Sequence, residues 1–544
     1  MPSTTGRLSG LRAYVLLTVL CLGLYLPGLA AIPPLDRDEA RFAQATRQML
    51  ETGDFLRIRF QDEARNKKPA GIYWLQAASV AAFSTADSTA VWPYRVPSLI
   101  GAIAAVLMLL AFGRVFLGAD PPRAAFTAAI LLATSIALVA EAHIAKTDAA
   151  LLASVVAGQG LLGLAYLRGR AGQAVPLLAA LGFWVAEAAA ILIKGPIGPG
   201  LALITAATLS IADREARWLR GLRPVAGGIL LVAILAPWLI AIERATAGQF
   251  LSDSLGHDLL SKLLGPQEAH GAPPLSYLVL SLATFWPGSL FLVPALVQGW
   301  RRRDDPAARF LLAWLIPAWV LLELVPTKLP HYVLPLYPAL ALLAAGGIGG
   351  VAPAGWARRV DVAVRVLWGL VTLALAAALV VLPWRYGTHG IVPGAIGALL
   401  VVGIGAVQAW RPSLAGMSLL ALAFAATLTG AVLPGLDRIW LSRSAASLVA
   451  AHAPAAGRPL VAVGYNEPSL VFLLGTDLRL ESPHAAADLL AHGGEVLVDD
   501  HEQPALQQAL DARKLTAQAL GRVEGTDYSN GRRIVVTLFD VEPE

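Results

Sequence analysis

Apolar segments of about twenty residues recur along most of this chain, and each is long enough to cross a bilayer as an α-helix. Of the 544 residues, 56% are hydrophobic and 15% are charged, and the mean hydropathy is +0.63. Soluble domains carry about a quarter charged residues, so this composition excludes a soluble protein. The single cysteine, Cys21, excludes an internal disulfide. The sequence therefore predicts an all-α polytopic membrane protein.

The hydropathy pattern predicts about thirteen membrane helices. They are expected at 13–31, 95–113, 124–142, 148–167, 174–193, 197–211, 225–241, 275–298, 308–324, 332–349, 361–382, 391–409 and 413–434. The first run is long for a signal peptide, and we expect it to remain as a helix. The apolar segment 69–84 is short for a span, and we interpret it as an interfacial or re-entrant helix.

Arginines alternate between the connecting loops in a way that predicts the topology. Those on one side are Arg7, Arg12, Arg114, Arg123, Arg168, Arg170, Arg214, Arg217, Arg220, Arg223, Arg301, Arg302, Arg303, Arg358, Arg359 and Arg411. The positive-inside rule makes that side cytoplasmic. An odd number of helices then places residues 437–544 outside, as a domain separate from the membrane part at 1–436. The basic residues are scattered through loops, so no nucleic-acid surface is expected.

The outer loops carry ionisable and aromatic side chains close to helix ends. They are Asp38, Glu39, Arg41, Lys67 and Lys68 in the first loop, Glu141 and Asp148 in the second, Lys194 in the third, His257 in the fourth, and Lys328, His331 and Tyr332 in the fifth. Topology does not require positive charge on this side. We therefore infer that these side chains form a site.

Each of these residues also has a structural interpretation. Asp38 and Glu39 suit the first turn of any helix, and Asp148 suits a helix N-cap. Lys68 and Lys328 are placed as interfacial lysines whose ammonium groups reach toward water. The functional interpretation rests on convergence, because five loops bring acids and lysines to one membrane face.

Carboxylates combined with lysines suit transfer from a phosphate-linked donor. A carboxylate accepts the proton of an attacking hydroxyl, and lysines offset the charge that develops on a departing phosphate. Nucleotides are scarce outside the cytoplasm. An activated sugar on that side is therefore expected to be carried by a lipid phosphate.

The ordered motifs "DRDEARFAQ", "KKPAGIYW", "KTDAALL", "LIKGPIGP" and "TKLPHYVLPLYPALALL" resemble those of the C-type glycosyltransferases. The resemblance covers nearly the whole chain. It is to the bacterial lipid A aminoarabinose transferases and their lipopolysaccharide-modifying relatives, with protein O-mannosyltransferases more distant. It implies thirteen helices, juxtamembrane helices in the first outer loop and a C-terminal periplasmic domain. It also implies a bacterial inner-membrane location, a polyprenyl-phosphate sugar donor and inverting transfer.

The residues and the resemblance together assign roles to the loop side chains. The catalytic candidates are Asp38, Asp148 and Glu39, with Glu39 and Arg41 also supporting the first loop. The candidates for binding the donor phosphate are Lys68, Lys194, Arg41 and Lys328. The candidates for contacting substrate or a metal are His331, His257, Tyr332 and Glu141.

Two positions depart from the family pattern. Lys67 stands where the aminoarabinose enzymes carry a glutamate that helps to hold a metal, and Phe42 stands where a tyrosine is usual. The first departure argues against a divalent metal and puts aminoarabinose specificity in doubt, so the cofactor and the sugar are left open.

The C-terminal segment alternates strand-like and helix-like patterns. "PLVAVGY", "GEVLVDD" and "RRIVVTLFDV" have strand length, and "PSLVFLLG", "HAAADLLAH" and "QPALQQALDAR" have helical spacing. A small α/β domain without catalytic residues is expected.

Three functions fit these patterns. They are a transferase that acts on an outer-leaflet glycolipid such as lipid A, an O-mannosyltransferase-like enzyme that acts on protein hydroxyls, and a transporter or flippase. The chain shows no internal repeat, which disfavours the transporter. The expected partners are the lipid-linked donor, the acceptor and the bilayer, and a monomer is expected.

Overall fold

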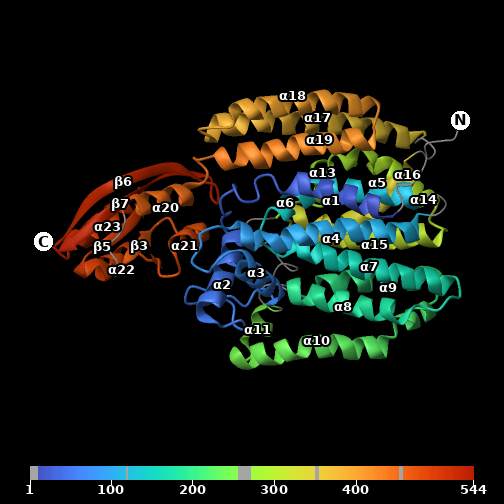
Figure 1. The fold of residues 1–544 in the computed structure, drawn as a ribbon, viewed down its shortest axis with the longest axis horizontal. Helices are drawn as coiled ribbons and strands as arrows, with labels where there is room; N and C mark the ends of the chain where they lie inside the picture. The colour runs from blue at the N-terminus through green and yellow to red at the C-terminus, as the bar shows by residue number, and fades with distance from the viewer. Residues whose placement is uncertain are drawn as a thin grey trace.

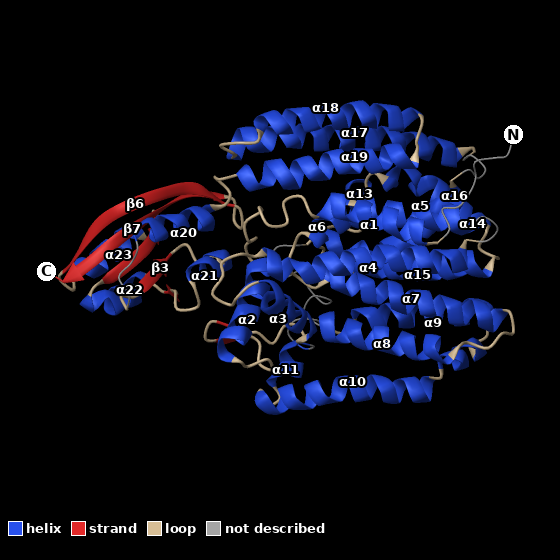
Figure 2. Ribbon diagram, in the orientation of Figure 1, coloured by secondary structure: helices blue, strands red, loops and turns tan. Residues whose placement is uncertain are grey.

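Residues 10–117, 121–254, 256, 271–348, 354–452 and 457–543 are described by the computed structural model. A bundle of long helices contains most of the chain, and a smaller part built on a β-sheet follows at the C-terminal end (Figures 1 and 2). His257 lies outside the described residues, so its expected role stays a prediction.

The bundle is built from helices that run roughly side by side (Figure 1). They are α1 (Leu11–Tyr25), α4 (Trp92–Phe116), α5 (Pro121–Thr134), α6 (Ile136–Ala142), α7 (Asp148–Arg170), α8 (Leu177–Lys194), α9 (Ile197–Asp213), α10 (Pro224–Ala245), α13 (Ser276–Thr284), α14 (Leu292–Arg301), α15 (Pro306–Leu324), α16 (Tyr337–Gly347), α17 (Trp356–Tyr386), α18 (Ile391–Trp410) and α19 (Leu414–Thr427).

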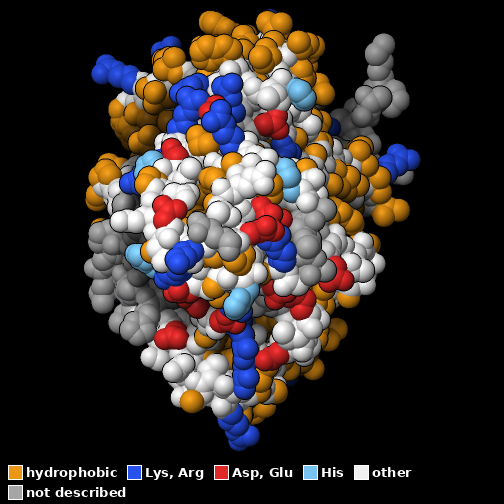
Figure 3. All heavy atoms as spheres, turned by 90° about the vertical axis from the view of Figure 1, so that its left-hand side faces the viewer, with side chains coloured by type: hydrophobic (Ala, Val, Ile, Leu, Met, Phe, Trp, Pro, Cys, Tyr) orange, Lys and Arg blue, Asp and Glu red, His pale blue; other side chains and the backbone are white. Residues whose placement is uncertain are grey.

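Within the described residues, eight helices are long and apolar enough to cross a membrane, and a bent pair makes a ninth. A multi-span helical membrane protein is therefore confirmed, whereas the number thirteen stays a prediction. Apolar side chains such as Leu399 and Trp410 are exposed on the bundle, where lipid would cover them. Viewed from the C-terminal end, charged side chains are scattered over the front, and hydrophobic ones gather at the top and sides (Figure 3).

Two expected spans are interrupted. The segment 124–142 bends by 61° between α5 and α6, because the N–H of Ile136 donates to the carbonyl of Trp286 instead of to its own helix. The segment 275–298 breaks between α13 and α14 around Pro287, which has no N–H to continue a helix. The short 3-10 helix η3 (Gly288–Phe291) lies between them.

Short helices gather at the end of the bundle that faces the C-terminal part (Figure 1). They are α2 (Asp38–Thr52), α3 (Gly71–Phe83) and α11 (Gln249–Leu251). The 3-10 helix η4 (Pro330–Leu336) packs against α6 and α7. The two-stranded β1 (Arg59–Phe60) and β2 (Glu63–Ala64) lie between α2 and α3 in sequence. Helix α3 has 13 residues, or about 20 Å of helix, which is shorter than the ~30 Å apolar core of a bilayer.

The C-terminal part contains a five-stranded sheet in the order β4-β3-β5-β7-β6. The strands are β3 (Leu460–Val463), β4 (Arg479–Leu480), β5 (Gly494–Asp499), β6 (Leu515–Asp527) and β7 (Arg532–Pro543). Strand β3 pairs in parallel with β4 and β5, and β7 pairs antiparallel with β5 and β6. Every residue of the central strand β5 is buried.

Four helices accompany the sheet: α20 (Leu441–His452), α21 (Pro468–Leu474), α22 (Pro483–Leu489) and α23 (Gln503–Asp511). Helix α21 contacts α2 of the bundle end. This α/β arrangement follows the strand-like and helix-like patterns of the sequence, while the boundary at residue 437 stays a prediction.

Candidate functional site

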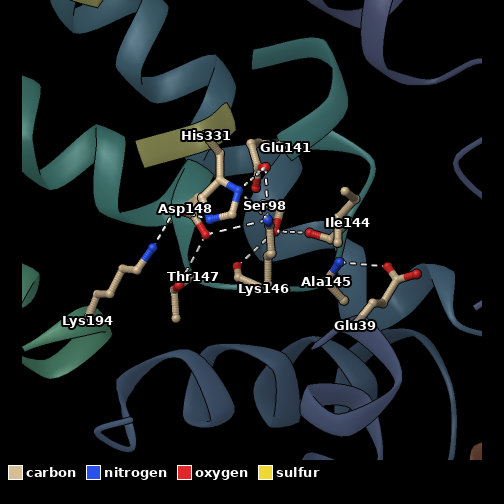
Figure 4. Close-up of polar contacts among 10 residues, drawn as sticks. All are labelled: Glu39, Ser98, Glu141, Ile144, Ala145, Lys146, Thr147, Asp148, Lys194 and His331. Carbon is tan, nitrogen blue, oxygen red and sulfur yellow. Dashed lines mark hydrogen bonds and ion pairs between the residues drawn. The ribbon is translucent and has the colours of Figure 1, made fainter. Parts of the chain in front are cut away.

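Two acids and two lysines form a cluster where the second and third outer loops meet (Figure 4). Glu141, Lys146 and Asp148 are buried, and Lys194 is half-buried. The Nζ of Lys194 lies 2.5 Å from Oδ1 of Asp148, and the Nζ of Lys146 lies 2.9 Å from Oε1 of Glu141. A longer contact of 3.8 Å joins Lys146 Nζ to Asp148 Oδ2. The four charges balance, so the cluster can be buried without a large penalty.

Local sequence explains how these side chains reach one another. Asp148 is the first residue of α7 and Lys194 is the last residue of α8. Gly195 ends α8 with a φ of 72°, a conformation that glycine adopts without strain, and Pro196 follows it. The bend before α6 brings Glu141 back toward the start of α7. Each charged group is thus held at a helix end.

His331 enters the same cluster from η4 (Figure 4). Its Nδ1 lies 3.4 Å from the Nζ of Lys146, and its Nε2 lies 3.8 Å from Oδ1 of Asp148. Burial lowers the pKa of His331 to about 3, so the ring is neutral at physiological pH. Tyr332 places its ring edge-on to His331 and 5.7 Å from the Nζ of Lys194.

Lys146 keeps its charge within this cluster. Burial by itself disfavours an ammonium group, but Glu141 and Asp148 outweigh that effect and hold the pKa of Lys146 above its usual range. The cluster therefore places two lysine ammonium groups, those of Lys146 and Lys194, beside two acids. Lys146 begins the motif "KTDAALL", but the sequence does not indicate that its ammonium group contacts Glu141, Asp148 and His331.

A cavity of about 380 Å³ opens beside the cluster. Its polar lining is Lys67, Lys68, Asp148, Lys194, His331 and Tyr332, together with Ser254. The remaining lining is mainly apolar and includes Leu151, Ile191, Ile197, Trp238, Leu239, Phe250 and Leu322. The cavity thus joins several lysines to a largely hydrocarbon wall.

Asp38 and Glu39 have different environments although they are neighbours. Asp38 is exposed at the first position of α2. Against the larger effect of burial, its negative charge makes a small contribution that favours the protonated forms of Lys146 and His331, which puts it within electrostatic reach of the cluster. Glu39 is fully buried, and its two oxygens lie 2.8 Å from Nε and Nη2 of Arg95. It also accepts the N–H groups of Leu35 and Ala145.

The catalytic role expected for Glu39 does not fit this geometry. Its carboxylate already accepts hydrogen bonds from Arg95 and from two backbone N–H groups. Glu39 therefore has a structural role, in which it connects the first outer loop to the second. Sequence reasoning missed Arg95, which has no exposed surface and also donates to the carbonyls of Leu29, Ile32 and Pro33. The sequence did offer one signal of its importance. Arg95 is the first residue of the expected span 95–113, on the side where positive charge is not required.

Two expected phosphate ligands lie elsewhere. Lys328 is buried and its Nζ donates to the carbonyl of Val325 at 2.7 Å. Arg41 is half-buried on α2. Neither belongs to the described residues that line the cavity. Lys67, by contrast, lines it; the sequence analysis placed Lys67 among the outer-loop side chains of the site but assigned it no role.

The side chains present do not fit a divalent metal. Asp148 and Glu141 already pair with ammonium groups, and Lys67 and Lys68 add positive charge to the same cavity. The described part of the chain contains no group of three or more His, Cys, Asp or Glu side chains suited to hold one.

Comparison with known proteins supports the resemblance of the loop motifs. No protein-family model matches the chain. The undecaprenyl phosphate-alpha-4-amino-4-deoxy-L-arabinose arabinosyl transferase of Pectobacterium carotovorum is 26% identical over 406 residues, which cover 69% of this chain and 67% of that protein. The enzyme of the same name from Edwardsiella ictaluri is 27% identical over 391 residues, covering 70% and 67%. That from Erwinia tasmaniensis is 26% identical and covers 65% and 62%.

Solved structures extend the similarity to nearly the full length. The crystal structure of ArnT from Cupriavidus metallidurans bound to undecaprenyl phosphate has a TM-score of 0.74 at 18% identity, covering 97% of this chain and 98% of that one. An oligosaccharyltransferase from Archaeoglobus fulgidus has a TM-score of 0.50 at 11% identity, covering 96% and 73%. The chain therefore shares the fold of these solved structures and is similar in sequence to the bacterial arabinosyl transferases named above.

Proposed function

We propose that this chain is a membrane glycosyltransferase that moves a sugar from a polyprenyl-phosphate donor to a lipid acceptor in the outer leaflet, such as lipid A. The observation that carries the proposal is the cavity that is lined both by apolar side chains and by Lys67, Lys68 and Lys194. A lipid phosphate likewise combines an apolar chain with an anionic head.

The lysines suit the departing phosphate. Ammonium groups that are already in place stabilise charge as it develops, and they act more strongly where water is excluded. Asp148 holds Lys194 at 2.5 Å, so this ammonium is positioned before the donor arrives. The relatives named above act on undecaprenyl-phosphate sugars, and the structural relative holds undecaprenyl phosphate, which supports this class of donor.

The reaction we propose is a single displacement at the anomeric carbon. An acceptor oxygen forms the new bond to that carbon while the bond between the carbon and the phosphate oxygen breaks, and the electron pair stays on the phosphate. Asp38 receives the acceptor's proton, or orients the acceptor if it is already ionised. Its exposed position at the start of α2, near Lys146 and His331, supports this role.

The orientation in the membrane belongs to the same proposal. The arginine-rich loops are cytoplasmic, and the cavity, α2 and the C-terminal part lie on the periplasmic side of a bacterial inner membrane. Helix α7 begins with Asp148 of the cavity lining and ends with Arg168 and Arg170, which supports this arrangement. We further propose that the enzyme acts as a monomer.

Single-turnover transfer with a purified lipid-linked donor tests the phosphate site. Lys194→Ala removes a charged contact worth about 1.5–3 kcal/mol, so donor use should fall about 10- to 150-fold. Lys194→Arg should restore little, because a planar guanidinium is larger than an ammonium. Lys328→Ala is the matched control, since this buried lysine lies outside the cavity lining, and it should keep donor affinity. Equal loss in both variants would contradict the assignment.

The acceptor is tested in cells. Mass spectrometry of lipid A, lipopolysaccharide and other membrane lipids from a deletion strain should show the loss of one sugar. Loss of a sugar from secreted proteins instead, with unchanged lipids, would establish the O-mannosyltransferase-like alternative.

A further inference from the structure

The two residues before Asp38 are bound by the C-terminal part. The N–H of Asp36 donates to the hydroxyl of Tyr528 at 2.6 Å, and the carboxylate of Asp36 accepts a hydrogen bond from the hydroxyl of Ser469. The guanidinium of Arg37 donates to the carbonyl of Ser529 at 2.8 Å. Residues more than 400 positions apart therefore meet immediately beside the proposed base.

The backbone at Arg37 needs such support. Arg37 has a φ of 63° and a ψ of −98° and stands at the N-cap of α2. Residues other than glycine rarely adopt a positive φ, and they keep it only where the surroundings impose it. The contacts of Asp36 and Arg37 with the C-terminal part supply this constraint, because they hold Arg37 itself and the residue before it.

The C-terminal anchors are themselves fixed. The Oγ of Ser469 lies 2.6 Å from the Oγ of Ser442, which lies 2.7 Å from the hydroxyl of Tyr465. Tyr528 packs edge-on against Trp440, with ring centroids 6.0 Å apart. The groups that hold Asp36 belong to a buried hydrogen-bonded chain and an aromatic pair, so they form a rigid support.

On the other side of Asp38 the bundle supplies the anchor. Glu39 is locked by Arg95 and by the N–H of Ala145. Asp38 thus lies between a residue pair held by the C-terminal part and a residue held by the membrane part. We propose that the C-terminal part is a positioning element for catalysis, in which Tyr528 and Ser469 hold the chain at Asp36 so that Asp38 faces the cluster.

This inference rests on the proposed function for its kinetic consequence, but its structural content is separate. The two parts also meet far from Asp38. Arg479 forms an ion pair with Asp62 at 3.0 Å. The neighbouring Gln61 donates its backbone N–H to the side chain of Gln48, which lies about 15 Å along α2 from the start of the helix. Arg479→Ala therefore perturbs the same interface without touching the residues beside Asp38, and it serves as the matched control.

The kinetic test compares Tyr528→Phe, Ser469→Ala and Arg479→Ala in the full-length protein. A misplaced reacting group typically slows a reaction about 100-fold, so the first two variants should lower kcat about 10- to 100-fold. The donor KM should stay unchanged, because the lysines of the cavity are untouched. Arg479→Ala should match the wild type.

A double-mutant cycle with Asp38→Asn tests whether the effect passes through Asp38. In that background Tyr528→Phe should slow transfer no further. Losses of kcat that multiply in the double variant, or a wild-type kcat in both Tyr528→Phe and Ser469→Ala, would overturn the proposal.

Hydrogen exchange gives a readout that does not depend on turnover. Amides 36–40 should exchange faster in Tyr528→Phe and Ser469→Ala than in the wild type, and Arg479→Ala should leave them protected. Unchanged protection would overturn the positioning role even if transfer were slowed. If the wild type transfers no sugar from a polyprenyl-phosphate donor while these amides respond as expected, the proposed function fails and the positioning contact stands.

Discussion

The ion pair between Glu39 and Arg95 allows a quantitative test of what Glu39 does. Neither side chain has any exposed surface, and the two groups share a pair of contacts at 2.8 Å. Removing one partner of a buried pair leaves an uncompensated charge and costs about 3–5 kcal/mol of unfolding free energy. Glu39→Gln and Arg95→Met should each lose an amount in this range.

The two losses should differ and should not add. Arg95→Met also abandons the carbonyls of Leu29, Ile32 and Pro33, so its loss should be the larger. In the double variant neither charge is left buried alone. Its loss should therefore be clearly smaller than the sum of the single losses.

Reversible unfolding in mixed micelles would measure these free energies, with single-turnover transfer measured on the same samples below the unfolding transition. Under those conditions the folded Glu39→Gln variant should keep part of its turnover. Any loss should come from greater mobility of the first outer loop and not from the loss of a reacting group. A Glu39→Gln variant with wild-type stability and no transfer would refute this reasoning and restore Glu39 as a catalytic group.

Two further predictions concern two half-buried acids and a glycine within a helix. Burial raises the pKa of Asp36 to about 6 and that of Glu467 to about 7, so folding favours their protonated forms. The stability they contribute is complete below pH ~4 and is lost as pH rises through 6–7. A series of thermal melts at different pH should show this fall in melting temperature. The variant that combines Asp36→Asn with Glu467→Gln should show a smaller dependence of melting temperature on pH. At Gly101 an added Cβ would lie 2.7 Å from the backbone carbonyl oxygen of Ala149, so Gly101→Ala should cost about 1–3 kcal/mol in unfolding experiments, whereas Gly200→Ala, with open space around it, should not. A pH-independent melt, or equal stability of the two glycine variants, would contradict the respective argument.

Much of the membrane part was predictable because its signals are local. The length of an apolar run and the side on which arginines lie can be read without knowing any contact. Two of the expected spans are interrupted, at Ser135 and around Pro287, and the cause is partly non-local. A backbone N–H found its acceptor on another helix at the first break.

The site was predictable in part for a similar reason. Asp148, Lys194, His331, Tyr332 and Lys68 all stand at helix ends in outer loops, and the structure brings them to one cavity. Lys328 has the same kind of sequence environment, yet its ammonium turns to a neighbouring carbonyl. The direction of a long side chain at a helix end depends on what packs around it, which the local sequence does not specify.

The sequence by itself determined the class of the protein, the order of its loop motifs and the membrane face at which its charges gather. Only the tertiary structure decided which neighbour of an acidic pair reaches the cluster. Consecutive residues on a helix point about 100° apart, so Asp38 remains exposed near Lys146 while Glu39 turns into the bundle toward Arg95. The tertiary structure also decided that Tyr528 and Ser469 hold the start of α2. Contacts between such distant residues arise from the packing of two separately built parts, and no local pattern records them.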